Sequence, residues 1–185
     1  RRRRFNEVLL RDEGEHIALT LKPLRGFFQE ATVNGYSGGV ERIYQPLEPS
    51  TINNRFLHQL IVDMYLLLPA ERRAVSSTWD IGIHLYRITA QPDVPGQPVP
   101  EGPHRDGHEF TSITLVKRHN IEGGESLFCD QQARVRLRHT LHQPLETALF
   151  DDAQGLHDVT PIHSLDRVNS GYRDICGFSL NPCPQ

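Results

Sequence analysis

The sequence predicts a mainly β fold with supporting α-helices, and two observations lead to this prediction. Short segments with alternating apolar residues, such as Ile81, Ile83 and Leu85, recur along the chain, and a period of two is typical of half-buried strands. Turn sequences separate these segments at intervals of roughly 8 to 12 residues, as in sandwiches and barrels. One segment has a strong helical period instead. We therefore expect a helix-supported double-stranded β-helix, or jelly roll.

The segment from Asn53 onward predicts the main helix. Its apolar residues recur on one helical face: Phe56, Leu57, Leu60, Ile61, Met64, Tyr65 and Leu68. This spacing is typical of an amphipathic helix that packs against a sheet. We expect Ser50 or Thr51 to cap the helix and Pro69 to help end it.

Strands are expected on both sides of this helix. Before it, residues 15–21 alternate, and turns are expected at Asn34-Gly35 and at Ser37-Gly38-Gly39. After it, the expected strands cover residues 79–88, 110–116, 126–129, 133–137, 147–150, 159–162 and 175–180. Residues 91–103 are rich in proline and predict a loop.

Composition and charge exclude several classes of function. The 185 residues are 37% hydrophobic and 23% charged, which fits a single globular domain over residues 1–185. The net charge of −3 provides no global basic field for nucleic acid or an anionic membrane, and residues 1–4, all arginine, are expected to be a solvated terminal run. No apolar run reaches the roughly 18 residues of a membrane span. Cys129, Cys176 and Cys183 lack paired spacing, so reduced thiols and a cytoplasmic protein are expected.

Two histidines and one aspartate have the spacing of a metal site. His104 and Asp106 are two residues apart, so both side chains project to one face of an extended strand. His157 opens a later apolar segment after a glycine turn. Two imidazoles and one carboxylate on one face of an octahedral ion leave three positions open, which suits Fe(II) oxygen chemistry. On spacing alone an alternative stays open, in which Asp106 makes a turn and His104 is a surface residue.

Four strings surround these residues in order: residues 101–108 (EGPHRDGH), 118–126 (RHNIEGGES), 157–162 (HDVTPI) and 171–175 (GYRDI). Together they resemble the 2-oxoglutarate- and Fe(II)-dependent dioxygenases, and within them the group of free-amino-acid hydroxylases that includes bacterial L-isoleucine hydroxylase. Residues 41–47 (ERIYQPL) also look similar to this group. The resemblance covers most of the chain, from about Val33 to Leu180, and the first part of the chain matches less clearly.

The resemblance implies a jelly-roll, cupin-like fold, bound Fe(II), 2-oxoglutarate as co-substrate and O2. The implied products are a hydroxylated substrate, succinate and CO2, and the implied substrate is a free L-amino acid or a close derivative. His104, Asp106 and His157 fall on the family's metal triad. Halogenating relatives lack the carboxylate, so Asp106 favours hydroxylation.

The resemblance also implies an arginine for the distal carboxylate of 2-oxoglutarate, on the strand after the second histidine. A guanidinium can fork onto a carboxylate with two parallel hydrogen bonds. Arg173 opens a predicted strand and is the expected residue. Arg167 is the alternative, closer to His157 but in a segment that predicts a loop.

The substrate contacts are less determined by the sequence. A free amino acid needs a cation for its carboxylate and an anion for its ammonium group. Arg118 and Glu125 are candidates for these contacts, as are Glu101 and Glu109. His108 is expected beside the metal site or in the substrate pocket, because a fourth protein ligand would block positions that O2 and the co-substrate need.

Two other function classes stay open at this point. One is a cupin-like metalloenzyme that does not use 2-oxoglutarate, and the other is a non-catalytic jelly-roll binding module. An intact triad with a candidate co-substrate arginine argues against the binding module. Residues 91–103 and 37–49 are candidate lid segments, because a reactive iron site benefits from closure.

Overall fold

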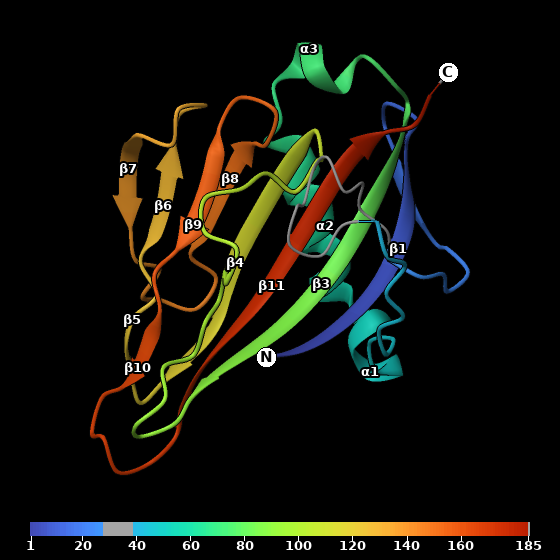
Figure 1. Ribbon diagram of the computed structural model, residues 1–185. Helices are drawn as coiled ribbons and strands as arrows, with labels where there is room; N and C mark the ends of the chain where they lie inside the picture. Colours follow the sequence, from blue (N-terminus) through green and yellow to red (C-terminus); the bar gives the residue numbers. More distant parts are fainter. Residues whose placement is uncertain (28–38, 185) are drawn as a thin grey trace.

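The computed structural model describes residues 1–27 and 39–184, and this part of the chain contains eleven strands and three helices (Figure 1). The helices are α1 (Pro49–Ile52), α2 (Arg55–Leu66) and α3 (Ala70–Arg73). The strands are β1 (Arg2–Asp12), β2 (Ile17–Leu21), β3 (Thr78–Ala90), β4 (Phe110–His119), β5 (Ile121–Gly123), β6 (Ser126–Cys129), β7 (Val135–His139), β8 (Thr147–Asp151), β9 (Leu156–Val159), β10 (Ile162–Ser164) and β11 (Gly171–Pro182).

Six strands form the larger sheet, in the order β2-β1-β3-β11-β4-β8, and all neighbouring pairs are antiparallel. The other strands form two smaller antiparallel sheets, β7-β6-β9 and β10-β5. Figure 1 places these smaller sheets beside β4 and β8, away from β1. The fold is therefore mainly β with supporting helices, and its jelly-roll class is confirmed.

The outer face of the larger sheet carries the main hydrophobic core. Helix α2 lies across this face (Figure 1) and buries Leu57, Ile61, Met64 and Tyr65 against it. The strand residues of the same core are Val8, Leu10, Trp79, Ile81, Ile83, Phe110, Cys176, Phe178 and Leu180. Burial of each large apolar side chain contributes roughly 1.5–3 kcal/mol. The sheet is thus held firmly from the side opposite the candidate site.

The inner face of the larger sheet takes the alternate residues of the same strands, because side chains alternate across a strand. On β3 these include His84 and Tyr86, and on β11 they include Arg173 and Ile175; all four line one cavity. Polar and charged side chains therefore face inward here together with some apolar ones, whereas the face towards α2 is apolar.

Most of the expected strands are confirmed with modest changes of bounds, and residues 126–129 coincide with β6. The strand expected over residues 159–162 is wrong. Pro161 separates β9 from β10, because proline has no N–H for a strand ladder. The turn at Asn34-Gly35 and most of that at Ser37-Gly38-Gly39 lie outside the described residues.

The start of the main helix also differs from the expectation. Ser50 and Thr51 do not cap α2, because both lie within the short α1. Asn54 caps α2 instead, and its side chain accepts a hydrogen bond from the backbone N–H of Phe56 at 2.8 Å. A polar side chain satisfies one of the free N–H groups that begin every helix, and Asn54 is the residue placed to do so here.

The expectation that the N-terminal arginines form a solvated run is wrong. They open β1, where Arg3 pairs with Tyr86 of β3. Arg2 is exposed, whereas Arg3 is partly buried and lines the inner cavity. Arg4 forms an ion pair with Glu48 at 2.6 Å. Strand alternation, rather than closeness to the end of the sequence, decides which arginine faces inward.

The three cysteines are free, as expected from their spacing. Among the described residues, no helix has the length and apolar character that crossing a membrane requires.

Candidate active site

His104, Asp106 and His157 converge at one end of the inner cavity. The distance from His104 Nε2 to Asp106 Oδ1 is 3.6 Å, and that from His157 Nε2 to Asp106 Oδ2 is 3.5 Å. One ligand atom from each residue lies within 4.8 Å of the others. Ligands about 2.1 Å from an ion and at right angles lie about 3 Å apart. The cluster is therefore close to the size of a single coordination sphere.

Backbone pairing brings the two histidines together. The N–H of His104 donates to the carbonyl of His157 at 3.0 Å, and the N–H of His157 donates to the carbonyl of His104 at 2.8 Å. This isolated bridge joins the segment before β4 to β9. Asp106 follows in a segment without regular secondary structure, and the next residue, Gly107, has a φ of +82°. A positive φ favours glycine, so a glycine is the suitable residue at position 107.

A buried aspartate that the sequence did not single out holds the Asp106 segment in place. Asp152 is 1% exposed, and its carboxylate accepts hydrogen bonds from the backbone N–H groups of Asp106, Gly107 and His108 at 3.1, 2.7 and 3.1 Å. Its Oδ1 also lies 3.6 Å from Nδ1 of His157. Asp152 thus positions Asp106 through the backbone and lies behind His157, an arrangement typical of groups that orient metal ligands.

The imidazole of His104 is oriented for a ligand at Nε2. Its Nδ1 lies 2.9 Å from the carbonyl of Gly102 and donates to it, which directs Nε2 towards Asp106. Burial would lower the pKa of His104, but the Asp106 carboxylate outweighs burial and raises it to about 9. Burial would likewise raise the pKa of Asp106, but hydrogen bonding to His104 and the charge of His157 hold it well below its usual range. Without a cation, a proton thus occupies this cluster, and a bound metal would displace it.

A buried arginine in the same cavity has no counter-charge among residues 1–27 and 39–184. Arg173 on β11 is 2% exposed, and its Nε and Nη2 have no hydrogen-bond partner. Burial and then the charge of Arg118 lower its pKa to about 10, so the side chain stays charged at neutral pH. A buried, unpaired charge is strongly unfavourable. Arg173 therefore fits a site for an anionic ligand, as the distal carboxylate of 2-oxoglutarate would require.

Arg118 lies next to Arg173 rather than near the triad. The two residues are direct partners across β4 and β11. A Cβ on Gly124 would lie 3.3 Å from Arg118 Nη1 and 3.6 Å from Arg173 Cδ, and Gly124 has a φ of +72°. Arg118 also donates to the carbonyl of Gly123 at 2.8 Å. The Gly-Gly turn thus has the positive φ values that its residues suggest, and it leaves room for both guanidinium groups.

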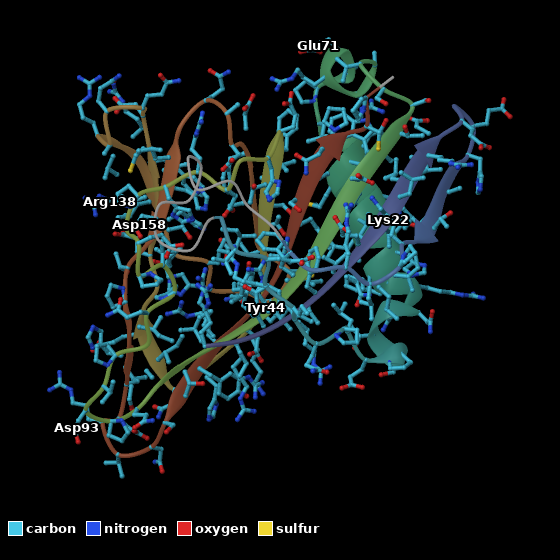
Figure 2. All side chains as sticks on the ribbon, turned by 45° about the vertical axis from the view of Figure 1, so that its right-hand side comes forward. Lys22, Tyr44, Glu71, Asp93, Arg138 and Asp158 are labelled. Atoms are coloured by element: carbon cyan, nitrogen blue, oxygen red, sulfur yellow. The ribbon has the colours of Figure 1, made fainter. Side chains whose placement is uncertain are left out.

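The remaining predicted residues are divided between the cavity and the surface. His108 lines the cavity, and its Nδ1 accepts from the side-chain amide of Asn181 at 3.1 Å. Glu125 pairs with Arg138 at 3.1 Å and is not among the residues that line the cavity. Figure 2 shows Arg138 at the outer edge of the β7-β6-β9 sheet. Arg167 lies in an exposed turn with a φ of +54°, also away from the cavity lining.

Of the two candidate lid segments, residues 91–103 form part of the cavity wall. Pro98, Val99 and Glu101 line the cavity. The backbone of Gly96 exchanges hydrogen bonds with Ile162 at 2.9 Å in both directions. This segment is therefore anchored to β10 at one point. Part of the other candidate, residues 37–38, lies outside the described residues.

We expect Asp152→Asn to weaken metal binding roughly 10- to 100-fold, as is typical for groups that orient ligands. An amide offers one acceptor oxygen where the carboxylate accepts three N–H groups. Anaerobic titration with Fe(II) or Mn(II) measures the effect. Asp130→Asn is the matched control, because Asp130 also accepts backbone N–H groups, from Gln132 and Arg134, outside the cavity. Equal metal affinities in the two variants would contradict the positioning role.

His84 gives a prediction about pH and stability. Burial, then the charges of Arg3 and His108, lower its pKa well below 6.5, with Asp106 acting weakly in the opposite direction. The unfolded chain therefore binds more protons below pH 6.5, so stability is complete above that pH and is lost as the pH falls, by about 1.4 kcal/mol per unit. Urea unfolding of the metal-free protein at about pH 7.5 and about pH 5.5 should show a smaller pH dependence in His84→Gln. The same dependence in both proteins would refute this assignment.

Comparison with known proteins adds family information to this geometry. A family model described as 2OG-Fe dioxygenase matches residues 1–179. The 3(1)-hydroxy-L-isoleucine 4-dioxygenase of Pantoea ananatis (strain AJ13355) is 26% identical over 159 residues, which are 85% of this chain and 64% of that protein. The chain therefore spans less than two thirds of this curated relative.

Solved structures have the same fold. A BsmA homologue from Methylobium petroleophilum PM1 superposes with a TM-score of 0.82 and 29% identity, covering 97% of this chain and 71% of its own. IDO from Bacillus thuringiensis superposes with a TM-score of 0.77 and 18% identity, covering 98% of this chain and 75% of its own. The Fe(II)/(alpha)ketoglutarate-dependent dioxygenase TqaL superposes with a TM-score of 0.69 and 16% identity, covering 100% of this chain and 67% of its own. The last two are similar in fold alone.

Proposed function

Because the chain belongs to the 2OG-Fe dioxygenase family, we propose that it hydroxylates an aliphatic carbon of a free L-amino acid or a close derivative. As a member of this family it is an enzyme that uses Fe(II), 2-oxoglutarate and O2. In our proposal His104, Asp106 and His157 hold the iron, and Arg173 binds the distal carboxylate of 2-oxoglutarate. The observation that carries it is one cavity with a two-histidine, one-carboxylate cluster and a buried, unpaired arginine.

The residues of this chain divide the work of the reaction between them. When bound, the iron and 2-oxoglutarate supply oxygen activation, with succinate and CO2 as by-products. The His104 Nδ1–Gly102 hydrogen bond and the Asp152 carboxylate keep the ligands oriented. Since Asp106 supplies a carboxylate at the third ligand position, no room is left there for a halide, which favours hydroxylation over halogenation.

The amino-acid substrate is supported by the curated relative. That protein is named for acting on a hydroxylated L-isoleucine, and the cavity here combines apolar walls with charged groups. Its apolar and weakly polar lining includes Ile88, Thr111, Ile113, Val159 and Ile175. A side chain of modest size fits such a wall, while ionic groups hold the remainder of the molecule.

The test is a screen of the twenty common L-amino acids, together with hydroxylated L-isoleucine, for succinate formation with Fe(II), 2-oxoglutarate and O2. We expect one or a few aliphatic amino acids to raise succinate formation above the substrate-free rate and to yield a product one oxygen atom heavier. Mass spectrometry identifies that product. If none of these compounds raises the rate, the substrate class is refuted, while slow substrate-free succinate formation would still report a competent co-substrate site.

A further inference from the structure

The cavity has a second cationic position, distinct from Arg173. We propose that Arg3 binds the carboxylate of the amino-acid substrate and that Glu101 binds its ammonium group. This inference rests on the proposed function and deepens it. Arg3 and Glu101 both line the cavity that contains His104, Asp106 and His157. They enter it from β1 and from the loop before β4, respectively.

Neutral groups hold Arg3 in place. Its Nη2 lies 2.6 Å from Nδ1 of His84, and its Nη1 donates to the hydroxyl of Tyr44 at 3.2 Å. The guanidinium carbon lies 4.2 Å from the ring centre of Phe27, 4.4 Å from that of Tyr44 and 5.0 Å from that of Tyr86. Figure 2 places Tyr44 beside the first half of β1. The side chain is thus oriented before any ligand binds.

In the described part of the chain, the charge of Arg3 has no counter-ion. Among the described residues no carboxylate lies within 4.0 Å of its nitrogens, and its buried Nε has no hydrogen-bond partner. His84 is not a counter-ion, because an imidazole is either neutral or cationic, and burial lowers its pKa so that the ring is neutral. Its Nδ1 therefore accepts from Arg3 while Nε2 donates to the hydroxyl of Ser179 at 3.3 Å. A partly buried, oriented and unpaired guanidinium is a ready receptor for a carboxylate.

Glu101 is the complementary group. Its Oε2 is buried and has no hydrogen-bond partner. Its Oε1 lies 3.9 Å from His104 Nε2, so the carboxylate lies at the edge of the metal cluster. A buried carboxylate oxygen without a donor is unfavourable, and an ammonium group with three N–H donors would satisfy it. Arg3 thus offers the cavity a cation with no carboxylate partner among the described residues, and Glu101 offers it a carboxylate with one unpartnered oxygen.

The other charged pairs proposed from the sequence are less suitable. Glu125 and Glu109 already pair with arginines, Arg138 and Arg72 respectively, and neither lines the cavity. Arg118 lies beside Arg173 and does not line the cavity. Of the acidic residues considered for the ammonium group, Glu101 is therefore the one inside the cavity.

Arg3 and Arg173 are far enough apart to bind two different carboxylates. They lie on β1 and β11, which are separated by β3. Arg3 pairs with Tyr86 and Arg173 pairs with Ile88, so the two arginines are also offset along the sheet. Two strand spacings of about 4.8 Å separate their backbones by about 10 Å. One cation can thus hold 2-oxoglutarate while the other holds the substrate.

The experiment measures binding to the anaerobic Mn(II)–2-oxoglutarate complex by calorimetry. The probes are L-isoleucine, L-isoleucinamide and the corresponding 2-hydroxy acid, replaced by the same three derivatives of another amino acid if the screen selects one. The amide lacks the carboxylate, and the hydroxy acid lacks the ammonium group. The variants are Arg3→Gln, Arg3→Lys and Glu101→Gln. Arg2→Gln and Glu122→Gln are matched controls, because both side chains are exposed.

We expect Arg3→Gln to weaken binding of the amino acid roughly 10- to 100-fold, since one charged hydrogen-bonded contact is lost. Binding of the amide should stay nearly unchanged. Glu101→Gln should weaken binding of the amino acid by a similar factor and leave binding of the hydroxy acid nearly unchanged. Arg3→Lys should recover part of the loss, because the charge returns without the fork. Circular dichroism and the affinity for 2-oxoglutarate, both unaltered, would show that the variants are folded.

Four results would overturn the assignment. The first is Arg3→Gln weakening the binding of the amino acid and of the amide equally. The second is Glu101→Gln weakening the binding of the amino acid and of the hydroxy acid equally. The third is Glu101→Gln weakening Mn(II) binding itself, which would make Glu101 a metal ligand. Unaltered binding of all three probes would overturn it as well. These outcomes differ from failure of the proposed function, in which the wild-type protein binds no L-amino acid of the screen.

Discussion

Replacing Asp106 with alanine is expected to abolish hydroxylation, lowering turnover roughly 1000-fold or more, because losing a ligand should exceed the 10- to 100-fold effect typical of groups that only orient ligands. Asp106 lies between the two histidines, 3.6 Å from His104 Nε2 and 3.5 Å from His157 Nε2. It is the one anion of the cluster. In our proposal, its removal takes away both a metal ligand and the charge that offsets a divalent cation.

Two measurements check this prediction. With anaerobic Fe(II) and 2-oxoglutarate, the wild-type protein should develop a weak visible charge-transfer band, and Asp106→Ala should not. Product analysis should then find no hydroxylated compound from the variant. Asp93→Ala is the control for expression and folding, because Asp93 is exposed in the loop between β3 and β4, at the lower tip in Figure 2. Normal product from Asp106→Ala would refute our assignment of the iron site.

The sequence predicted the elements whose pattern is local. The alternation of residues 79–88 and 175–180 indicated β3 and β11, and the one-sided helical face indicated α2, because side-chain periodicity records burial directly. The bounds of α2 depended on Asn54, a cap preceded by other polar residues that could also cap a helix. Such neighbours cannot be told apart without the backbone direction at the helix start.

The site was predictable only where spacing and motif strings coincide. His104 and Asp106 are close in sequence, and His157 was found from the string that contains it. Asp152 was not found, since its role depends on backbone N–H groups about 45 residues away in the chain, and these have no side-chain signature. The inward position of Arg3 was likewise hidden, because a run of four arginines has no hydrophobic alternation to indicate a strand.

Arg173→Met is the second replacement with a large expected effect, and it should change two properties in opposite directions. Arg173 is 2% exposed, its Nε and Nη2 are unpartnered, and it has no counter-charge among the described residues. Replacing a buried, unpaired charge with an apolar side chain of similar length removes an unfavourable burial, so the metal-free protein should be as stable as the wild type or more stable. The KM for 2-oxoglutarate should nevertheless rise roughly 100-fold, because a charge pair of two hydrogen bonds is lost.

Arg167→Met separates this role from general loss of positive charge, because Arg167 is exposed and lies away from the cavity lining. The KM of the Arg167→Met variant for 2-oxoglutarate should stay near that of the wild type. Urea unfolding adds a second readout, since a ligand that binds only the folded state at 100 times its Kd stabilises it by about 2.7 kcal/mol. With Mn(II) present, 2-oxoglutarate should stabilise the wild type and Arg167→Met, but not Arg173→Met. If Arg167→Met lost this stabilisation instead, the co-substrate would bind on the side of the exposed turn, and the unpaired charge of Arg173 would need another ligand.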